Sequence, residues 1–127
     1  MLIRELTTAE EEIMRVLWKL GKGFVKDVLA ELPDKPAYNT VSTIIRILEK
    51  KGLVGYTAYG KTHEYYPLIT EEQYRRFQTE QLMRNYFDGS LKKLVSFFVT
   101  DKKVSLSEAD EIIRLLQQTN PDKPQEP

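Results

Sequence analysis

Residues 39–50 have hydrophobic and polar positions that repeat with the period of an α-helix. At about 100° per residue, one side of this helix collects the aliphatic residues Val41, Ile44, Ile45 and Leu48. The opposite side carries amide, hydroxyl and cationic groups without a carboxylate: Asn39, Ser42, Thr43, Arg46 and Lys50. The first side can be buried in a core, and the second offers the groups that bind base edges and phosphates. We therefore expect a helix that lies in a groove of DNA.

Two amphipathic helices are predicted before it. The first spans about residues 8–20, with Thr8 and Glu11 as a capping box, and the second spans about residues 25–32. Pro33 ends the second helix because proline has no amide hydrogen to continue the helical hydrogen bonds. The residues expected in the core are Ile13, Val16, Leu17, Trp18, Leu20, Val25, Val28, Leu29 and Leu32.

The pattern changes after Gly52 to one typical of β-strands. Residues 53–58 and 62–68 are rich in tyrosine and threonine, and Tyr59-Gly60-Lys61 between them predicts a turn. Three helices followed by a hairpin form a winged helix-turn-helix, in which the hairpin is the wing. The fold class predicted is therefore mainly α with a small β-hairpin. Residues 1–69 are its winged-helix DNA-binding domain.

Residues 70–119 predict three more helices, in an arm separate from the DNA-binding domain. Thr70 and Gln73 form a second capping box, Asp88-Gly89 breaks the first helix of the arm, and Ser105 opens the last one. The prolines of residues 120–127 predict a disordered tail.

The arm also predicts the oligomeric state. Three short helices cannot bury the apolar residues of this arm by themselves, whereas two arms interleaved across a two-fold axis can. A dimer also places two recognition helices about one duplex turn apart, which lengthens the sequence that is read. The alternative is an arm that packs back onto the first domain. The residues expected at the dimer interface are Tyr74, Phe77, Leu82, Leu91, Leu94, Val95, Phe98, Ile112, Ile113 and Leu116.

Composition narrows the possible classes of protein. The chain of 127 residues has no cysteine and one histidine, His63, so we expect no metal site and no cofactor. No set of residues resembles a catalytic signature, and we expect no enzyme activity. No apolar run approaches the length of a membrane span, and the N-terminal residues do not resemble a signal peptide. A cytoplasmic protein is expected.

Charge is balanced overall, with 19 basic and 19 acidic residues, but it is not evenly distributed. Between residues 35 and 63 the only acid is Glu49, whereas the basic residues are Lys35, Arg46, Lys50, Lys51 and Lys61. A local basic region in a neutral chain suits sequence-specific binding of double-stranded DNA better than non-specific coating of it.

The side chains of this region fall into two predicted roles. Base edges would be read by Asn39, Ser42, Thr43 and Arg46. Phosphates would be bound by Tyr38, Thr40, Lys50, Lys51 and Lys61. Simpler alternatives remain open for several of these residues. Asn39 could instead be the N-cap of the helix. Arg46 could be an ordinary solvent-exposed arginine, and Tyr38 and Tyr59 could pack under the wing. His63 is expected to be a strand surface residue rather than a sensor.

With these residues stated, the chain resembles the penicillinase and methicillin-resistance repressor family of bacteria over residues 6 to about 116. The resemblance rests on the joint order and spacing of three motifs: Leu6-Thr7-x-Ala9-Glu10-x-x-Ile13-Met14-x-x-Leu17-Trp18, Tyr38-Asn39-Thr40-Val41-x-Thr43-Ile44-x-x-x-Leu48-x-x-Lys51-Gly52-Leu53, and Gly60-Lys61-Thr62-His63-Glu64-Tyr65-Tyr66-Pro67. The family implies a dimeric winged helix that represses transcription from a palindromic operator.

The resemblance also implies a means of release. In the family a membrane-bound sensor peptidase cuts the repressor in response to a signal, commonly a β-lactam antibiotic. The cut falls between Asn and Phe in the helix that corresponds to residues 91–99, where this chain has Phe97-Phe98. The first position of the pair therefore departs from the family pattern, and both residues also suit an apolar core. Copper-responsive relatives carry a cysteine pair, which this chain lacks.

A second function is compatible with the same fold. Some winged helices bind proteins instead of DNA, and such a module would favour acidic or exposed aliphatic residues on the helix of residues 39–50. The amides, hydroxyls and arginine found there favour DNA.

Overall fold

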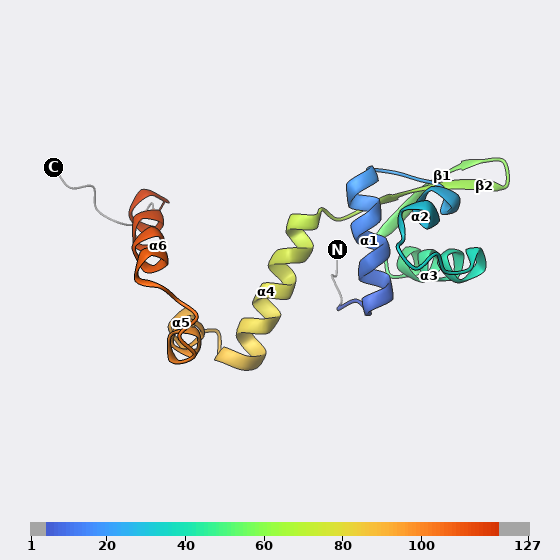
Figure 1. The fold of residues 1–127 in the computed structure, drawn as a ribbon. Helices are drawn as coiled ribbons and strands as arrows, with labels where there is room; N and C mark the ends of the chain where they lie inside the picture. The colour runs from blue at the N-terminus through green and yellow to red at the C-terminus, as the bar shows by residue number, and fades with distance from the viewer. Residues whose placement is uncertain (1–4, 120–127) are drawn as a thin grey trace. The chain divides into compact units, whose positions relative to one another are not determined.

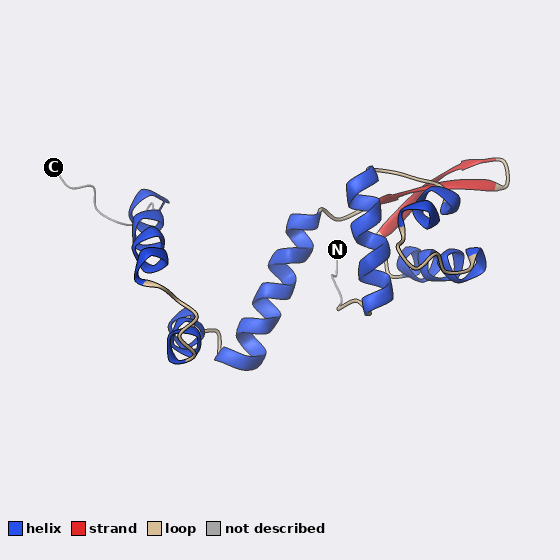
Figure 2. Ribbon diagram, in the orientation of Figure 1, coloured by secondary structure: helices blue, strands red, loops and turns tan. Residues whose placement is uncertain are grey.

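The computed structural model describes residues 5–119, so the tail predicted at 120–127 lies outside the described residues. Six helices and one antiparallel hairpin follow each other along these residues, and the mainly α fold class with a small hairpin is confirmed (Figures 1 and 2). The elements are α1 (Thr8–Leu20), α2 (Val25–Glu31), α3 (Tyr38–Lys50), β1 (Val54–Tyr59), β2 (Thr62–Pro67), α4 (Glu71–Phe87), α5 (Leu91–Thr100) and α6 (Leu106–Thr119).

The chain divides into two compact units, Met1–Glu80 and Gln81–Pro127. The boundary between these units lies inside α4, because the first part of α4 packs with α1, whereas the sequence predicted an arm that begins at residue 70. Tyr74 is buried, its ring lies 5.8 Å from that of Trp18, and Phe77 is packed against the same core. Two residues expected at the dimer interface, Tyr74 and Phe77, therefore belong to the core of the first unit.

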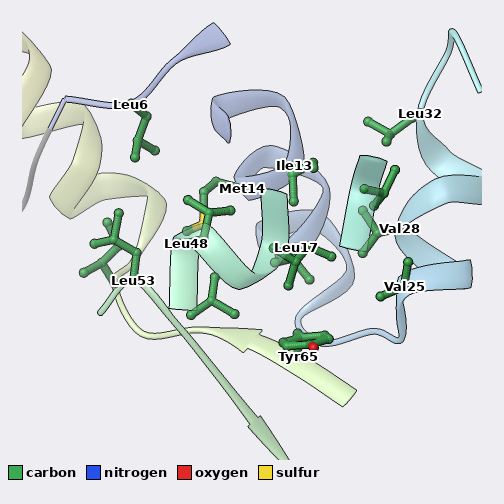
Figure 3. Packing of buried hydrophobic residues seen from close by; sticks show 14 of the residues in the cluster. Leu6, Ile13, Met14, Leu17, Val25, Val28, Leu32, Leu48, Leu53 and Tyr65 are labelled. Atoms are coloured by element: carbon green, nitrogen blue, oxygen red, sulfur yellow. The ribbon is translucent and has the colours of Figure 1, made fainter. Parts of the chain in front are cut away.

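The apolar sides of α1, α2 and α3 converge to form the core of the first unit (Figure 3). Met14 and Leu17 from α1 and Leu48 from α3 have no exposed surface. Each residue of this kind contributes about 1.5–3 kcal/mol when it leaves water, so the core fixes the orientation of α3. Trp18 is half-buried at its edge, and its indole Nε1 donates to the backbone oxygen of Ile69 at 2.9 Å.

Two sequence predictions about α1 are wrong. Leu20 is exposed rather than buried, because α1 ends there and Gly21 follows with a φ of 83°. The capping box is formed by Thr7 and Glu10, one residue before the predicted pair. The Thr7 hydroxyl accepts from the Glu10 amide at 3.1 Å, and the Glu10 carboxylate accepts from the Thr7 amide at 2.8 Å. This earlier start leaves Glu10 buried on the side of α1 that faces the end of α3.

Lys51 follows α3 and forms an ion pair with Glu10. Its ammonium donates to both carboxylate oxygens, at 2.9 and 2.7 Å. Burial alone would raise the pKa of Glu10, but the hydrogen bonds from Lys51 and Thr7 outweigh it, so the pKa is lowered. The ion pair ties the first turn of α1 to the end of α3.

The hairpin is held against the helices at its base. The backbones of Gly23 and Tyr65 exchange two hydrogen bonds, of 2.9 and 2.7 Å, and the Leu68 amide donates to the Leu53 oxygen at 2.8 Å. The contact at Gly23, which the sequence patterns did not predict, joins the α1–α2 loop to β2. Gly60 in the hairpin turn has a φ of 66°, a conformation that glycine adopts without strain.

The second unit is built from the end of α4 with α5 and α6. Ser90 caps α5, with its hydroxyl accepting from the Lys93 amide at 3.2 Å, and the Phe87 and Phe97 rings meet edge to face at 5.7 Å. α5 buries none of its side chains completely. Among the expected interface residues of this unit Leu94 is half-buried, and the exposed ones are Leu82, Leu91, Val95, Phe98, Ile112, Ile113 and Leu116.

Candidate nucleic-acid interface

The exposed side of α3 is set by how the helix begins and what it buries. Ala37 is the N-cap and offers no side-chain cap, so Asn39 lies inside the first turn and is not the N-cap. Val41, Ile45 and Leu48 are completely buried, which turns the opposite side of α3 to solvent. The exposed polar residues are Asn39, Thr40, Thr43, Arg46 and Lys50, and Ser42 is half-buried.

A cleft of about 590 Å³ separates the outer side of α3 from the hairpin. Its lining comes from the first turn of α2, from α3 and from both strands: Phe24, Val25, Lys26, Tyr38, Ser42, Arg46, Glu49, Lys50, Tyr56, Lys61, Thr62, His63 and Tyr65. Four of these residues are cationic at neutral pH and only Glu49 is anionic. The cleft therefore carries a net positive charge, the electrostatic requirement for holding a phosphate backbone.

α2 supplies one wall of this cleft. The carboxylate of Asp27 accepts from the Phe24 amide at 2.9 Å, which fixes where α2 begins. The neighbouring hydrogen bonds between Gly23 and Tyr65 hold this turn against β2. Lys26 in the first turn of α2 thus belongs to the same cleft as Arg46 of α3 and Lys61 of the hairpin turn.

Aromatic side chains of the hairpin line the cleft opposite α3. The rings of Tyr56 and His63 are stacked, with centroids 4.1 Å apart and planes within 5°, and Tyr65 lies 6.0 Å from each of them. Tyr65 is buried, and this burial raises the pKa of its hydroxyl; nearby Glu49 acts in the same direction and Arg46 opposes it. The hydroxyl therefore stays protonated at neutral pH.

The structure groups some of the predicted DNA-binding residues in the cleft. Those that line it are Tyr38, Ser42, Arg46, Lys50 and Lys61. Asn39, Thr40 and Thr43 are exposed on α3 but do not line the cleft. Tyr59, for which packing under the wing was the alternative, is exposed, with its ring 6.0 Å from that of Phe24.

Lys51 does not join the other cations. Its side chain is 24% exposed and is paired with Glu10, away from the residues that line the cleft. In this structure the Lys51 ammonium is held in an ion pair within the fold rather than presented to the cleft. Sequence periodicity could not show this, because the partner lies 41 residues away.

The cleft is also lined by residues for which the sequence predicted no binding role: Phe24, Lys26, Tyr56, Thr62 and His63. The alternation along β2 places His63 and Tyr65 on one face, and the strand register pairs Tyr65 with Tyr56. A two-residue turn at Gly60-Lys61 gives that register, whereas a turn centred on Gly60 alone would pair Tyr56 with Glu64. The position of Lys26 depends on the Gly23–Tyr65 contact, for which the sequence offers no local signal.

Residues 5–119 show neither a metal site nor a membrane-spanning helix. No group of three or more histidine, aspartate or glutamate side chains among them is arranged to hold a metal ion. None of the helices described there has both the length and the hydropathy that crossing a bilayer requires.

Comparisons with known proteins agree with this geometry. The family model described as penicillinase repressor matches residues 6–118. The penicillinase repressor of Bacillus licheniformis is 26% identical over 118 residues, which cover 91% of this chain and 92% of that protein. The methicillin resistance regulatory protein MecI of Staphylococcus aureus (strain N315) is 25% identical over 114 residues, covering 88% and 93% of the two chains.

A solved structure also resembles part of this chain. The solution structure of the DNA-binding domain of the repressor BlaI has a TM-score of 0.51 and 31% sequence identity. The match covers 57% of this chain and 92% of that domain.

Proposed function

The chain belongs to the penicillinase repressor family, and we propose that it is a dimeric repressor of transcription that binds a palindromic operator and is released by proteolysis. The observation that carries this proposal is the cationic cleft between α3 and the hairpin, which combines Arg46, Lys50, Lys61 and Lys26. A single sugar–phosphate strand is the partner that fits this charge and position, since α3 then lies in the adjoining major groove.

In this proposal, different residues of α3 contact different bases of the operator. Arg46 donates two hydrogen bonds to a guanine edge, and Asn39 pairs with an adenine in the same way. Ser42 and Thr43 contact neighbouring bases. These bonds supply sequence preference, at about 1–3 kcal/mol for each good bidentate pair.

Phosphate contacts fix the register without reading sequence. Lys50 at the end of α3, Lys61 at the hairpin turn and Lys26 of α2 hold the backbone strand, and the Tyr38 hydroxyl adds a neutral donor. Thr40 contacts a phosphate of the other DNA strand, on the opposite side of α3. Lys51 is excluded from this set because its ammonium is bound to Glu10.

Dimerisation is proposed through the second unit. Leu91 of α5 is 61% exposed and Ile113 of α6 is 52% exposed, although both lie on apolar helix faces. Leaving such faces in water costs roughly 25 cal/mol per Å² of apolar surface. A second copy of the same unit covers both faces, and the two-fold symmetry of that pair is the symmetry of a palindromic operator.

Release is proposed to follow a cut at Phe97-Phe98 by a membrane sensor peptidase. Both rings are exposed within α5, and the chain must leave its helical form locally before a peptidase can bind it as a strand. The cut separates α6 from the DNA-binding unit. The gain from linking two binding units, about 10²–10⁴-fold, is then lost.

Selection from a random duplex library tests the core of the proposal. The full chain is expected to enrich a two-fold symmetric motif whose half-sites lie about one duplex turn apart. Enrichment of no sequence, with no binding to any duplex at low salt, would favour the alternative of a winged helix that binds proteins. An Arg46→Ala chain in the same selection should lose preference at one position of each half-site.

A further inference from the structure

His63 faces the cleft between α3 and the hairpin, and its ring is stacked on the ring of Tyr56. It lies on the same face of β2 as buried Tyr65, is half-buried, and lines the cleft. Its imidazole is stacked on the Tyr56 ring at 4.1 Å, with an angle of 5° between the planes. A stack this close restricts the orientation in which the imidazole meets a ligand in the cleft.

The groups around His63 come from every element that borders the cleft. α2 contributes Lys26, α3 contributes Arg46, Glu49, Lys50 and the Tyr38 hydroxyl, the turn contributes Lys61, and the strands contribute the Tyr56 and Tyr65 hydroxyls. The only fixed anion in this set is Glu49. A phosphate diester that enters the cleft brings a second negative charge beside the imidazole, and a nearby negative charge favours the protonated form of a histidine.

We propose that His63 is a DNA-contacting residue that takes up a proton when a backbone phosphate occupies the cleft, so that operator affinity rises as pH falls through the neutral range. This inference rests on the proposed function, since it requires the cleft to bind DNA. The imidazolium donates a charge-assisted hydrogen bond to the phosphate oxygen. Tyr56 positions the ring, and the electron-rich face of its phenol stabilises the cationic form.

The composition of the chain allows a proton taken up near neutral pH to be assigned to His63. Histidine is the side chain whose charge ordinarily changes between about pH 5 and 8, and His63 is the only histidine in the sequence. Duplex phosphates keep their charge throughout this range. By linkage, the slope of log affinity against pH gives the number of protons taken up, to a limit of about one for each protomer.

The test is a series of fluorescence-anisotropy titrations of the full chain against its selected operator duplex. The pH runs from about 6 to about 8.5 at constant ionic strength. The association constant of the wild type is expected to fall about three- to tenfold per protomer as the pH rises. His63→Gln should show a flat profile, with an association constant that no longer changes with pH.

Two further variants distinguish the effect of proton uptake by His63 from the effect of losing any one contact in the cleft. Lys61→Gln, which removes a charge from the same cleft, should weaken binding at every pH and keep the slope of the wild type. Tyr56→Phe, which keeps the aromatic stack, should also keep the slope. A slope that survives in His63→Gln would overturn the proposal.

Calorimetry of the wild type provides a measurement that does not depend on any variant. Binding enthalpies in two buffers of different ionisation enthalpy should reveal proton uptake close to neutral pH. Tight binding with no proton uptake would refute the role of His63 and leave DNA binding intact. Absence of binding at every pH would instead refute the proposed function.

Discussion

At the scale of single residues, the cations near α3 separate into those that line the cleft and one that forms an ion pair within the fold. Arg46 and Lys50 line the cleft, whereas neighbouring Lys51 is bound to buried Glu10. Lys50 and Lys51 are adjacent, but successive residues of a helix point about 100° apart. The side chain of Lys51, the C-cap of α3, therefore reaches Glu10 of α1, whereas that of Lys50 lines the cleft.

Arg46 and Lys50 should respond differently to removal. Arg46→Ala is expected to cost about 1–3 kcal/mol of operator affinity and to relax preference at one base pair. Lys50→Ala should weaken all sequences about equally and reduce the salt slope by about one unit. Anisotropy titrations against the operator and single-mismatch duplexes, at several salt concentrations, measure both effects. Unchanged sequence preference in Arg46→Ala would remove its base-reading role.

Glu10→Gln should destabilise the first unit by about 1–3 kcal/mol at neutral pH, because the Lys51 ammonium loses its charged partner. The hydrogen bonds lower the folded pKa of Glu10 below the ordinary glutamate value of 4.5, so this stabilisation is present above pH 4.5 and is lost as pH falls through the folded pKa. The difference in unfolding free energy from the wild type should therefore shrink in acid. Urea denaturation measures it, with Glu12→Gln on the exposed side of α1 as the control.

At the scale of elements, the periodicity of apolar residues predicted the helices, and the tyrosine and threonine content predicted both strands, to within one or two residues. The periodicity succeeded because each helix of the first unit buries one regular stripe, such as Val41, Ile45 and Leu48 of α3. It placed the capping box of α1 one residue late, since Thr7 and Thr8 are both good caps and only the contact with Lys51 distinguishes them. Lys26 and Tyr56 were missed because tertiary contacts bring them to the cleft.

The exposed faces of α5 and α6 lead to a prediction for the second unit. Ile113→Glu should convert the dimer to a monomer and lower affinity for the full operator by about 10²–10⁴-fold, while affinity for an isolated half-site is unchanged. Sedimentation equilibrium and anisotropy provide the two measurements. Glu111→Gln, on the polar side of α6, is the matched control and should remain dimeric. A dimer that persists in Ile113→Glu would place the interface elsewhere.

At the scale of the whole molecule, one continuous helix belongs to both units, because α4 starts in the core beside Trp18 and ends beyond the boundary at Glu80. The sequence predicted a helical arm that begins at residue 70, because Tyr74 and Phe77 fit an apolar stripe of that arm equally well. Only their packing against α1 assigns them to the first unit.

Proteolysis in α5 should separate α6 from the first unit and so weaken binding to the full operator. A chain treated with its sensor peptidase is expected to yield a fragment that ends at Phe97, as measured by mass spectrometry. This fragment should still bind a half-site but not hold the full operator at the concentrations that suffice for the intact chain. An intact chain after treatment, under conditions in which the peptidase cuts a control substrate, would contradict release by cleavage.

The claim on which the account depends is that a DNA strand occupies the cleft between α3 and the hairpin. Titration of the ¹⁵N-labelled chain with its operator, followed by NMR, tests this most directly. The account predicts that the largest amide shifts fall at Ser42, Arg46, Lys61 and His63, while the face of α1 around Arg15 stays unchanged. Saturating DNA that leaves these four amides unmoved, or that shifts the Arg15 face instead, would contradict it.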